Sequence, residues 1–172
     1  KFSSKVLCSF PETLRYLPKK KAVFTGLPIR NEIFSGDKEK GLRFCSFSSV
    51  EKRPVVLIMG GSQGSKRLNC FIRNNLTRLL KHYRVIHLTG KGNHEKTNLD
   101  SYWQKDFVGK ELKDLLAASD LVISRAGANS IFELLALKKP MLLIPLVIGS
   151  RGDQVLNAQS FKRQGWAEVI EE

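Results

Sequence analysis

From Pro54 onward the chain alternates short apolar runs with longer amphipathic stretches. The apolar runs are rich in Val, Ile and Leu, and several end in glycine, which is typical of strands that are buried on both faces. The predicted strands span residues 55–60, 84–90, 101–109, 121–127, 141–146 and 167–171.

The stretches between these runs carry apolar residues at helical spacing. Leu68, Ile72, Leu76, Leu79 and Tyr83 predict one continuous helix across residues 68–83. Further helices are expected at residues 111–120, 129–139 and 153–165, the last two ending at Pro140 and Gly165. Strands that alternate with helices predict an α/β fold with a doubly wound, Rossmann-like parallel sheet.

Residues 1–50 have a different character. They are rich in Pro, Gly, Ser and Lys and show no sustained helical period, so we expect short strands and turns, with an edge strand at Lys21–Thr25. We therefore divide the chain into an interdomain segment and linker, residues 1–50, and one domain, residues 51–172. Because the sequence does not begin with Met, we expect it to be a piece of a longer protein.

The charge is unusual, since 29 Lys and Arg residues against 16 Asp and Glu give a net charge of +13. This excess favours nucleic acid, an anionic membrane, an anionic substrate or simply a lysine-rich surface. The densest basic run, Pro18–Val23, contains no aromatic residue for base stacking, which disfavours nucleic acid. Cys8, Cys45 and Cys70 form no CxxC pair, which favours reduced thiols over a disulfide or a zinc site.

Candidate chemistry lies in the loops that follow the strands, because ligands of parallel sheets bind at the carboxyl ends of the strands. In the loop GGSQGS, the glycines Gly60, Gly61 and Gly64 let backbone N–H groups approach an anion, and Ser62 adds a hydroxyl. The spacing matches neither the Walker pattern nor GxGxxG, which disfavours a dinucleotide. A tight turn without a ligand is the alternative for this loop.

The loop SRAGANSIFE repeats this arrangement after a later strand. Gly127 ends the strand, and the small residues that follow start a helix whose N–H groups suit a phosphate. Glu133 lies about one turn into that helix and suits the hydroxyls of a ribose, although it also fits a role in complementing the helix dipole. Together the two loops predict a site for a ribosyl diphosphate.

The motifs GGSQGS, SRAG…E and LIPL…DQ…NA, together with GLPIR at residues 26–30, resemble the C-terminal domain of the MurG family. That family transfers N-acetylglucosamine from UDP-GlcNAc to lipid I, with inversion, to give lipid II. The resemblance implies one half of a GT-B glycosyltransferase. It makes residues 51–172 a UDP-sugar donor-binding domain without its C-terminal end, and residues 1–50 the tail of an N-terminal domain.

The resemblance also implies the role of each residue at the donor site. Arg30 and the backbone of Val108 would serve uracil, Ser62 the diphosphate, residues 128–132 the phosphates, Glu133 the ribose and Gln154 the sugar. The implied donor-binding set is Arg30, Gly61, Ser62, Gln63, Gly64, Val108, Gly127, Ala128, Asn129, Ser130, Ile131, Phe132, Glu133, Asp153 and Gln154. Asp153 stands where the family usually has glutamine, which leaves the first contact to the sugar open.

The resemblance places the acceptor site for lipid I and the catalytic base in the absent N-terminal domain, so the catalytic residues are unknown and this piece alone is expected to be inactive. It implies a cytoplasmic location at the inner face of the bacterial membrane, with peripheral membrane association left open and without nucleic acid. No cofactor is expected, and the lack of a DxD motif predicts no metal. His82, His87 and His94 are expected to be structural or solvated.

Two alternatives remain open. One is a separate donor-binding subunit of a split GT-B enzyme that uses another acceptor. The other, which rests on charge alone, is a basic nucleic-acid-binding domain, and it predicts retention on DNA that falls steeply with salt.

Overall fold

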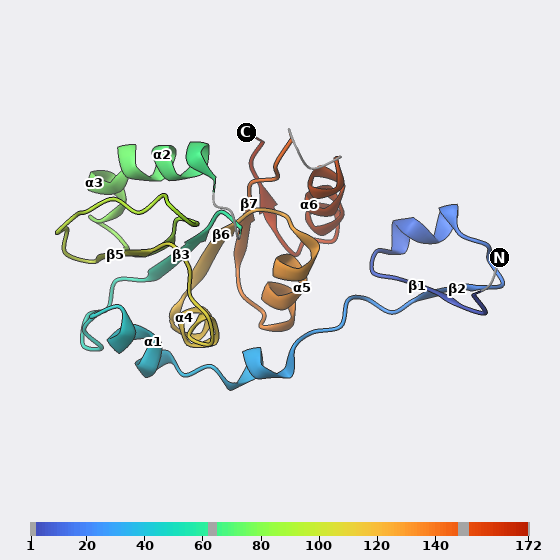
Figure 1. The fold of residues 1–172 in the computed structure, drawn as a ribbon, viewed down its shortest axis with the longest axis horizontal. Helices are drawn as coiled ribbons and strands as arrows, with labels where there is room; N and C mark the ends of the chain where they lie inside the picture. The colour runs from blue at the N-terminus through green and yellow to red at the C-terminus, as the bar shows by residue number, and fades with distance from the viewer. Residues whose placement is uncertain (1–2, 62–64, 148–151, 172) are drawn as a thin grey trace.

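The computed structural model describes residues 3–61, 65–147 and 152–171. Its centre is a parallel sheet of six strands in the order β5-β4-β3-β6-β7-β8 (Figure 1), which confirms the predicted fold class. The strands are β3 (Val55–Met59), β4 (Arg84–Leu88), β5 (Tyr102–Lys105), β6 (Leu121–Ser124), β7 (Met141–Leu143) and β8 (Glu168–Val169). The chain builds outward from β3 to β5, then returns and builds outward from β6 to β8, so the strand order reverses between β3 and β6.

Helices cover both faces of the sheet. On one face lie α2 (Lys66–Asn74) and α3 (Leu76–Leu79), and on the other lie α1 (Lys38–Phe44), α4 (Leu112–Ala118), α5 (Ala128–Ala136) and α6 (Asp153–Arg163) (Figure 1). In β3, Val55 and Leu57 pack with the second group of helices, whereas Val56 and Ile58 pack with the first. Burying a side chain of this size contributes about 1.5–3 kcal/mol, which explains why the predicted strands are apolar on both faces.

The predicted helix across residues 68–83 is wrong in one respect, because α2 and α3 are separate helices that meet at Asn75. The backbone of Asn75 has φ −110° and ψ 5°, and its side-chain amide donates to the carbonyl of Phe71 at 2.8 Å. An asparagine side chain competes in this way with helical backbone bonds. The apolar spacing continues across Asn75, so the sequence pattern did not reveal the break between the two helices.

Helix α1 contradicts the expectation of only strands and turns before residue 50. The backbone N–H of Asp37, its N-cap, donates to a carboxylate oxygen of Asp114 on α4 at 2.8 Å. A β-carbon on Gly41 would lie 2.2 Å from the carbonyl oxygen of Asp114, so only glycine permits this close approach. Leu42 and Cys45 are buried in the core that contains β3. Glycine is a poor helix former, which is why the sequence pattern did not predict α1.

Residues 3–26 form a small unit beside α6 (Figure 1). Its strands β1 (Val6–Cys8) and β2 (Ala22–Phe24) pair in parallel, which confirms the strand expected at Lys21–Thr25, and the 3₁₀ helix η1 (Pro11–Tyr16) lies between them. The ring of Phe10 packs edge-on against Phe132 with centroids 5.2 Å apart. Glu12 pairs with Arg163 of α6 at 2.6 Å.

An extended segment joins this unit to the main domain and contains the 3₁₀ helix η2 (Asn31–Ser35) (Figure 1). The division of the chain near residue 50 stays a prediction. Of the helices in the described part of the chain, none combines the length and the apolar character that crossing a bilayer requires.

Candidate functional site

A cavity of about 650 Å³ lies at the carboxyl ends of β3 and β6, where the strand order reverses. Ligands of doubly wound sheets bind at this position, and the volume lies in the range of small-molecule sites. The cavity is lined by Met59, Gly60, Gly61, Ser65, Lys66, Arg67, Leu88, Asp106, Phe107, Val108, Leu112, Ser124, Arg125, Gly127, Ser130, Leu146, Val147 and Gln154.

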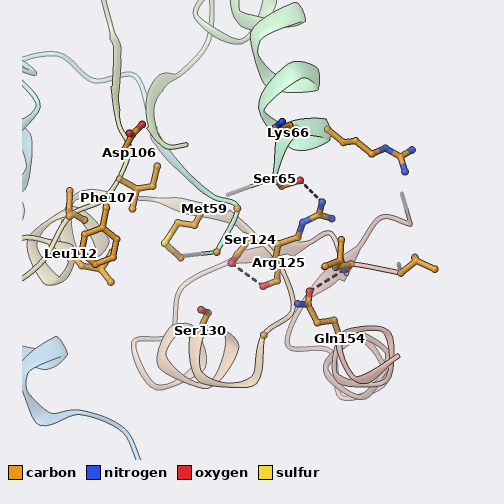
Figure 2. Close-up of a pocket in the computed structure, with 18 residues that line it drawn as sticks. Met59, Ser65, Lys66, Asp106, Phe107, Leu112, Ser124, Arg125, Ser130 and Gln154 are labelled. Atoms are coloured by element: carbon orange, nitrogen blue, oxygen red, sulfur yellow. Dashed lines mark hydrogen bonds between the residues drawn. The ribbon is translucent and has the colours of Figure 1, made fainter. Parts of the chain in front are cut away.

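The two ends of the cavity differ in chemistry. Figure 2 shows Phe107 and Leu112 at one end and Ser65, Arg125 and Gln154 at the other. Phe107 is 65% exposed and therefore offers an aromatic surface to a flat ring. The polar end offers hydrogen-bond donors and positive charge. A ligand with a ring at one end and an anionic or hydroxylated group at the other matches this division.

Arg125 is the most firmly held charged side chain of the polar end. It is only 6% exposed, and its guanidinium donates to the carbonyl of Ile144 at 3.0 Å and to the hydroxyl of Ser65 (Figure 2). These bonds join the segment after β7 to the start of α2 and fix the position of the positive charge. The sequence motif SRAG contains Arg125, but only its glycine was interpreted there, so this residue was missed.

The start of α5 is suited to an anion. Its N-cap is Gly127, which has no side chain to cap the first turn. Gly127 and Ser130 line the cavity, so the positive end of this helix faces it. The start of α2 differs, because the hydroxyl of Ser65 accepts a hydrogen bond from the N–H of Leu68 at 3.3 Å. The stronger anion position is therefore at α5.

Further charges surround the cavity. Lys66 and Arg67 lie at the start of α2, and Asp106 follows β5. Asp106 accepts from the N–H of Gly92 at 2.9 Å and from the hydroxyl of Thr89 at 3.1 Å. The bond from Gly92 is the main reason that the pKa of Asp106 lies below its ordinary value, so this carboxylate is ionised at neutral pH. Cations nevertheless outnumber carboxylates among the described residues that line the cavity.

Arg30 and Glu133 form an ion pair beside the cavity, not in its lining. The Nε of Arg30 donates to one carboxylate oxygen of Glu133 at 2.8 Å, and Nη2 donates to the other at 3.2 Å. These bonds are the main cause of a raised pKa for Arg30. The Glu133 side chain is 14% exposed, so its carboxylate is held by a partner at the edge of the site.

Among the sequence-predicted site residues, the cavity brings together Gly61, Val108, Gly127, Ser130 and Gln154. Gly61 has φ +85°, a conformation that glycine adopts without strain at the end of β3. The side-chain oxygen of Gln154 accepts from the N–H of Leu146 at 3.1 Å (Figure 2). This bond ties the start of α6 to the segment after β7.

The structure places the other predicted residues differently. Ala128 and Asn129 lie in the first turn of α5 outside the cavity lining, and Ile131 is fully buried in the core. The ring of Phe132 packs against Phe161 with centroids 5.3 Å apart, and Asp153 is exposed at the start of α6. Ser62, Gln63 and Gly64 lie outside the described residues. The donor-binding roles of the whole set stay predictions.

His87 has a structural role, which is one of the two roles expected for the histidines. Its ring lies 2.9 Å from the hydroxyl of Tyr102 and 3.0 Å from the side-chain oxygen of Asn69. Because that oxygen only accepts, the facing Nε2 of His87 carries the proton. Burial lowers the pKa of His87 to about 4, so the ring is neutral at physiological pH. Within the described ranges, no group of three or more His, Cys, Asp or Glu residues is placed to hold a metal ion.

Comparison with known proteins places the chain in a family. Residues 55–172 match the glycosyltransferase family 28 C-terminal domain. The chain belongs to this family. The whole chain is also similar to proteins named UDP-N-acetylglucosamine–N-acetylmuramyl-(pentapeptide) pyrophosphoryl-undecaprenol N-acetylglucosamine transferase. It is 56% identical over 173 residues to the protein of Lachnoclostridium phytofermentans and 51% identical over 175 residues to transferase 2 of Bacillus cereus. The matches cover 99% and 100% of this chain but 48% and 49% of those proteins, so the chain spans about half the length of these relatives.

The fold of the family 28 domain is also found in solved structures. The crystal structure of MurG from Acinetobacter baumannii superimposes with a TM-score of 0.68 at 20% identity, over 98% of this chain and 47% of that protein. At this identity the likeness shows the fold alone. The curated relatives confirm the resemblance to the MurG family that the motifs indicated.

Proposed function

We propose that this chain is the donor-binding half of an inverting N-acetylglucosaminyltransferase of peptidoglycan synthesis, and that it binds UDP-GlcNAc. The observation that carries this proposal is the cavity where the strand order reverses, with an aromatic end and a positively charged end beside the start of α5 at Gly127. The names of the curated relatives support UDP-GlcNAc as donor and the lipid-linked muramyl pentapeptide as acceptor.

The proposed position of the donor follows from the chemistry of the two ends. Uracil lies against Phe107 and the backbone of Val108, and the diphosphate lies at the start of α5 near Arg125. In this arrangement Glu133 accepts hydrogen bonds from the ribose hydroxyls, and Gln154 contacts the sugar. The fit is supported by the volume of the cavity and by the side chains that line it.

The proposed contribution to catalysis is stabilisation of the leaving group. Negative charge develops on UDP as the bond to the sugar breaks, and fixed N–H groups and a buried guanidinium offset that charge without reorganising. The start of α5 and Arg125 have these properties. The base that activates the acceptor hydroxyl belongs, on this proposal, to a preceding domain of the full-length enzyme.

A lipid acceptor implies that the reaction takes place at a membrane surface. We therefore propose that the full-length enzyme acts at the cytoplasmic face of the membrane as a peripheral protein. The net charge of +13 supports this proposal, since each basic residue near an anionic lipid surface contributes about 1 kcal/mol.

Calorimetric titration of the chain with UDP-GlcNAc, UDP, NAD and a short DNA duplex tests the donor assignment. The expected result is saturable binding of UDP-GlcNAc that UDP displaces, with no sugar transfer to a lipid I analogue by the chain alone. Gln154→Ala is expected to weaken UDP-GlcNAc and leave UDP unchanged, because this residue is placed at the sugar. Preference for NAD, or DNA binding that UDP does not affect together with no binding of UDP-GlcNAc, would overturn the proposal.

A further inference from the structure

We propose that the outer surface of α2 and α3 binds the headgroups of an anionic lipid bilayer. This inference rests on the proposed action at a membrane, and it is independent of the donor site. It names the surface of this chain that would face the lipid, which the net charge alone does not locate.

Carboxylates are absent from one long stretch of the sequence. Residues 52–94 are a quarter of the chain and contain no Asp or Glu, so they carry +9 of the net charge of +13. The nine basic residues of this stretch are Lys52, Arg53, Lys66, Arg67, Arg73, Arg78, Lys81, Arg84 and Lys91. The positive charge is therefore concentrated in one part of the chain, which a uniformly lysine-rich surface does not explain.

This stretch supplies the helices on one face of the sheet. The helices α2 and α3 lie together there, and neither contains an acidic residue (Figure 1). Each of the four helices on the opposite face contains one, which is Glu39 in α1, Asp114 in α4, Glu133 in α5 and Asp153 in α6. The two helical layers of the domain therefore differ in charge.

Several of the basic side chains on this surface are available to a partner. Lys66, Arg78 and Lys81 are exposed, and none of them forms an ion pair with another described residue. Arg73 differs, because it pairs with Glu95 at 2.6 Å. Exposed cations without a carboxylate partner keep their full attraction for an anionic surface.

An aromatic side chain lies among these charges. Phe71 is 62% exposed, and it lies four residues after Arg67 and three before Asn74, so the three side chains share the outward face of α2. Helices that lie on a bilayer combine basic residues, which meet the lipid phosphates, with apolar residues that enter the boundary with the acyl chains. The lipid-linked acceptor of the proposed reaction favours a bilayer over a nucleic acid or an acidic protein as the partner.

Sedimentation of the chain with lipid vesicles tests the inference. The chain is expected to bind vesicles that contain phosphatidylglycerol, with an affinity that falls as salt is added, and not to bind vesicles of phosphatidylcholine alone. Arg78→Gln combined with Lys81→Gln is expected to weaken binding about 25-fold, since each basic residue contributes about fivefold. Phe71→Ser is expected to weaken the binding that remains at high salt, where the charges are screened.

The matched control is Lys19→Gln combined with Lys20→Gln, which removes the same charge from the densest basic run of the sequence. This pair lies outside α2 and α3 and is expected to leave vesicle binding unchanged. Equal weakening by the two double variants would overturn the inference, because net charge alone would then explain the binding. Binding of a short DNA duplex in place of vesicles, weakened by the substitutions at Arg78 and Lys81, would overturn it in favour of a nucleic-acid surface.

Titration with UDP in solution, without vesicles, keeps the donor site separate. The variants are expected to bind UDP as the wild-type chain does, because the substituted residues are not among the described residues that line the cavity. Failure of the wild-type chain to bind UDP would overturn the donor assignment and not this inference. Failure of the wild-type chain to bind vesicles with phosphatidylglycerol would overturn this inference and not the donor assignment.

Discussion

Arg125, just after β6, donates a hydrogen bond to the hydroxyl of Ser65, which caps α2. The two residues are 60 positions apart in sequence and meet across the point where the strand order reverses. This bond and the second bond of Arg125 to the carbonyl of Ile144 hold three loop segments around one cavity. A buried positive charge is thereby fixed beside the start of α5.

Arg125→Gln is expected to weaken UDP binding about 10- to 100-fold, as befits loss of a hydrogen bond between a charged group and a phosphate. Uridine lacks the phosphates, so its affinity is expected to stay within about twofold of wild type on the same grounds. Calorimetry with both ligands measures the difference. Arg78→Gln, on the exposed surface of α3, is the matched control. Equal weakening of both ligands would mean that Arg125 only supports the local structure.

Gly41→Ala is expected to lower the free energy of unfolding by about 1–3 kcal/mol, the usual cost of overpacking. The added methyl would lie 2.2 Å from the carbonyl oxygen of Asp114, so α1 must move away from α4. Gly109→Ala is the control, since a β-carbon on Gly109 would lie 3.7 Å from its nearest neighbour, a carboxylate oxygen of Glu111. Urea unfolding of both variants measures the effect. An unchanged midpoint for Gly41→Ala would contradict the close contact between α1 and α4.

His87 is expected to make the fold less stable as the pH falls from about 6.5 to about 4. The pKa of His87 is 6.5 in a model peptide and about 4 in the folded chain, because burial disfavours the charged ring. In this window the unfolded chain binds a proton that the folded chain does not, so the free energy of unfolding decreases by at most about 3 kcal/mol and then levels off below the folded pKa.

Urea unfolding at a series of pH values measures this contribution. His87→Phe is expected to show a shallower pH dependence between about pH 4 and 6.5, since the buried histidine with the lowered pKa is gone. His82→Asn replaces a histidine on the exposed surface and serves as the matched control. Parallel plots of unfolding free energy against pH for His87→Phe and wild type would contradict a buried, neutral His87.

Donor binding is expected to need no divalent metal. Arg125 and the start of α5 supply positive charge at the place where a diphosphate would lie. Titration of UDP-GlcNAc in EDTA and in magnesium is expected to give the same affinity. Loss of binding in EDTA with recovery on adding magnesium would show that this positive charge is insufficient.

The sequence predicted the sheet because its strands are buried on both faces and are therefore continuously apolar. It also predicted the strand-end loops, since glycine and small residues follow those strands. It did not predict α1, which depends on the contact of Gly41 with a carbonyl 73 residues further along the chain. Nor did it predict the break at Asn75, where a side-chain bond interrupts an unbroken apolar pattern.

The candidate site was also predicted only in part, because contacts between distant residues decide which side chains reach it. Motif reasoning located Gly61, Gly127 and Ser130, which line the cavity through their positions at strand ends. It did not locate Phe107 or Arg125 as cavity residues, because their orientation depends on how β5, β6 and β7 align in the sheet. The pairing of Arg30 with Glu133 was also hidden, since it joins residues 103 positions apart.

The most direct test of the account is a map of backbone amide shifts in ¹H–¹⁵N spectra during titration with UDP-GlcNAc. The largest changes are expected at Val108, Gly127 and Ser130, around the cavity between β3 and β6. Unchanged amides at these positions, with the largest changes instead in the groove between α2 and residues 92–95 that contains Arg73 and His94, would contradict it.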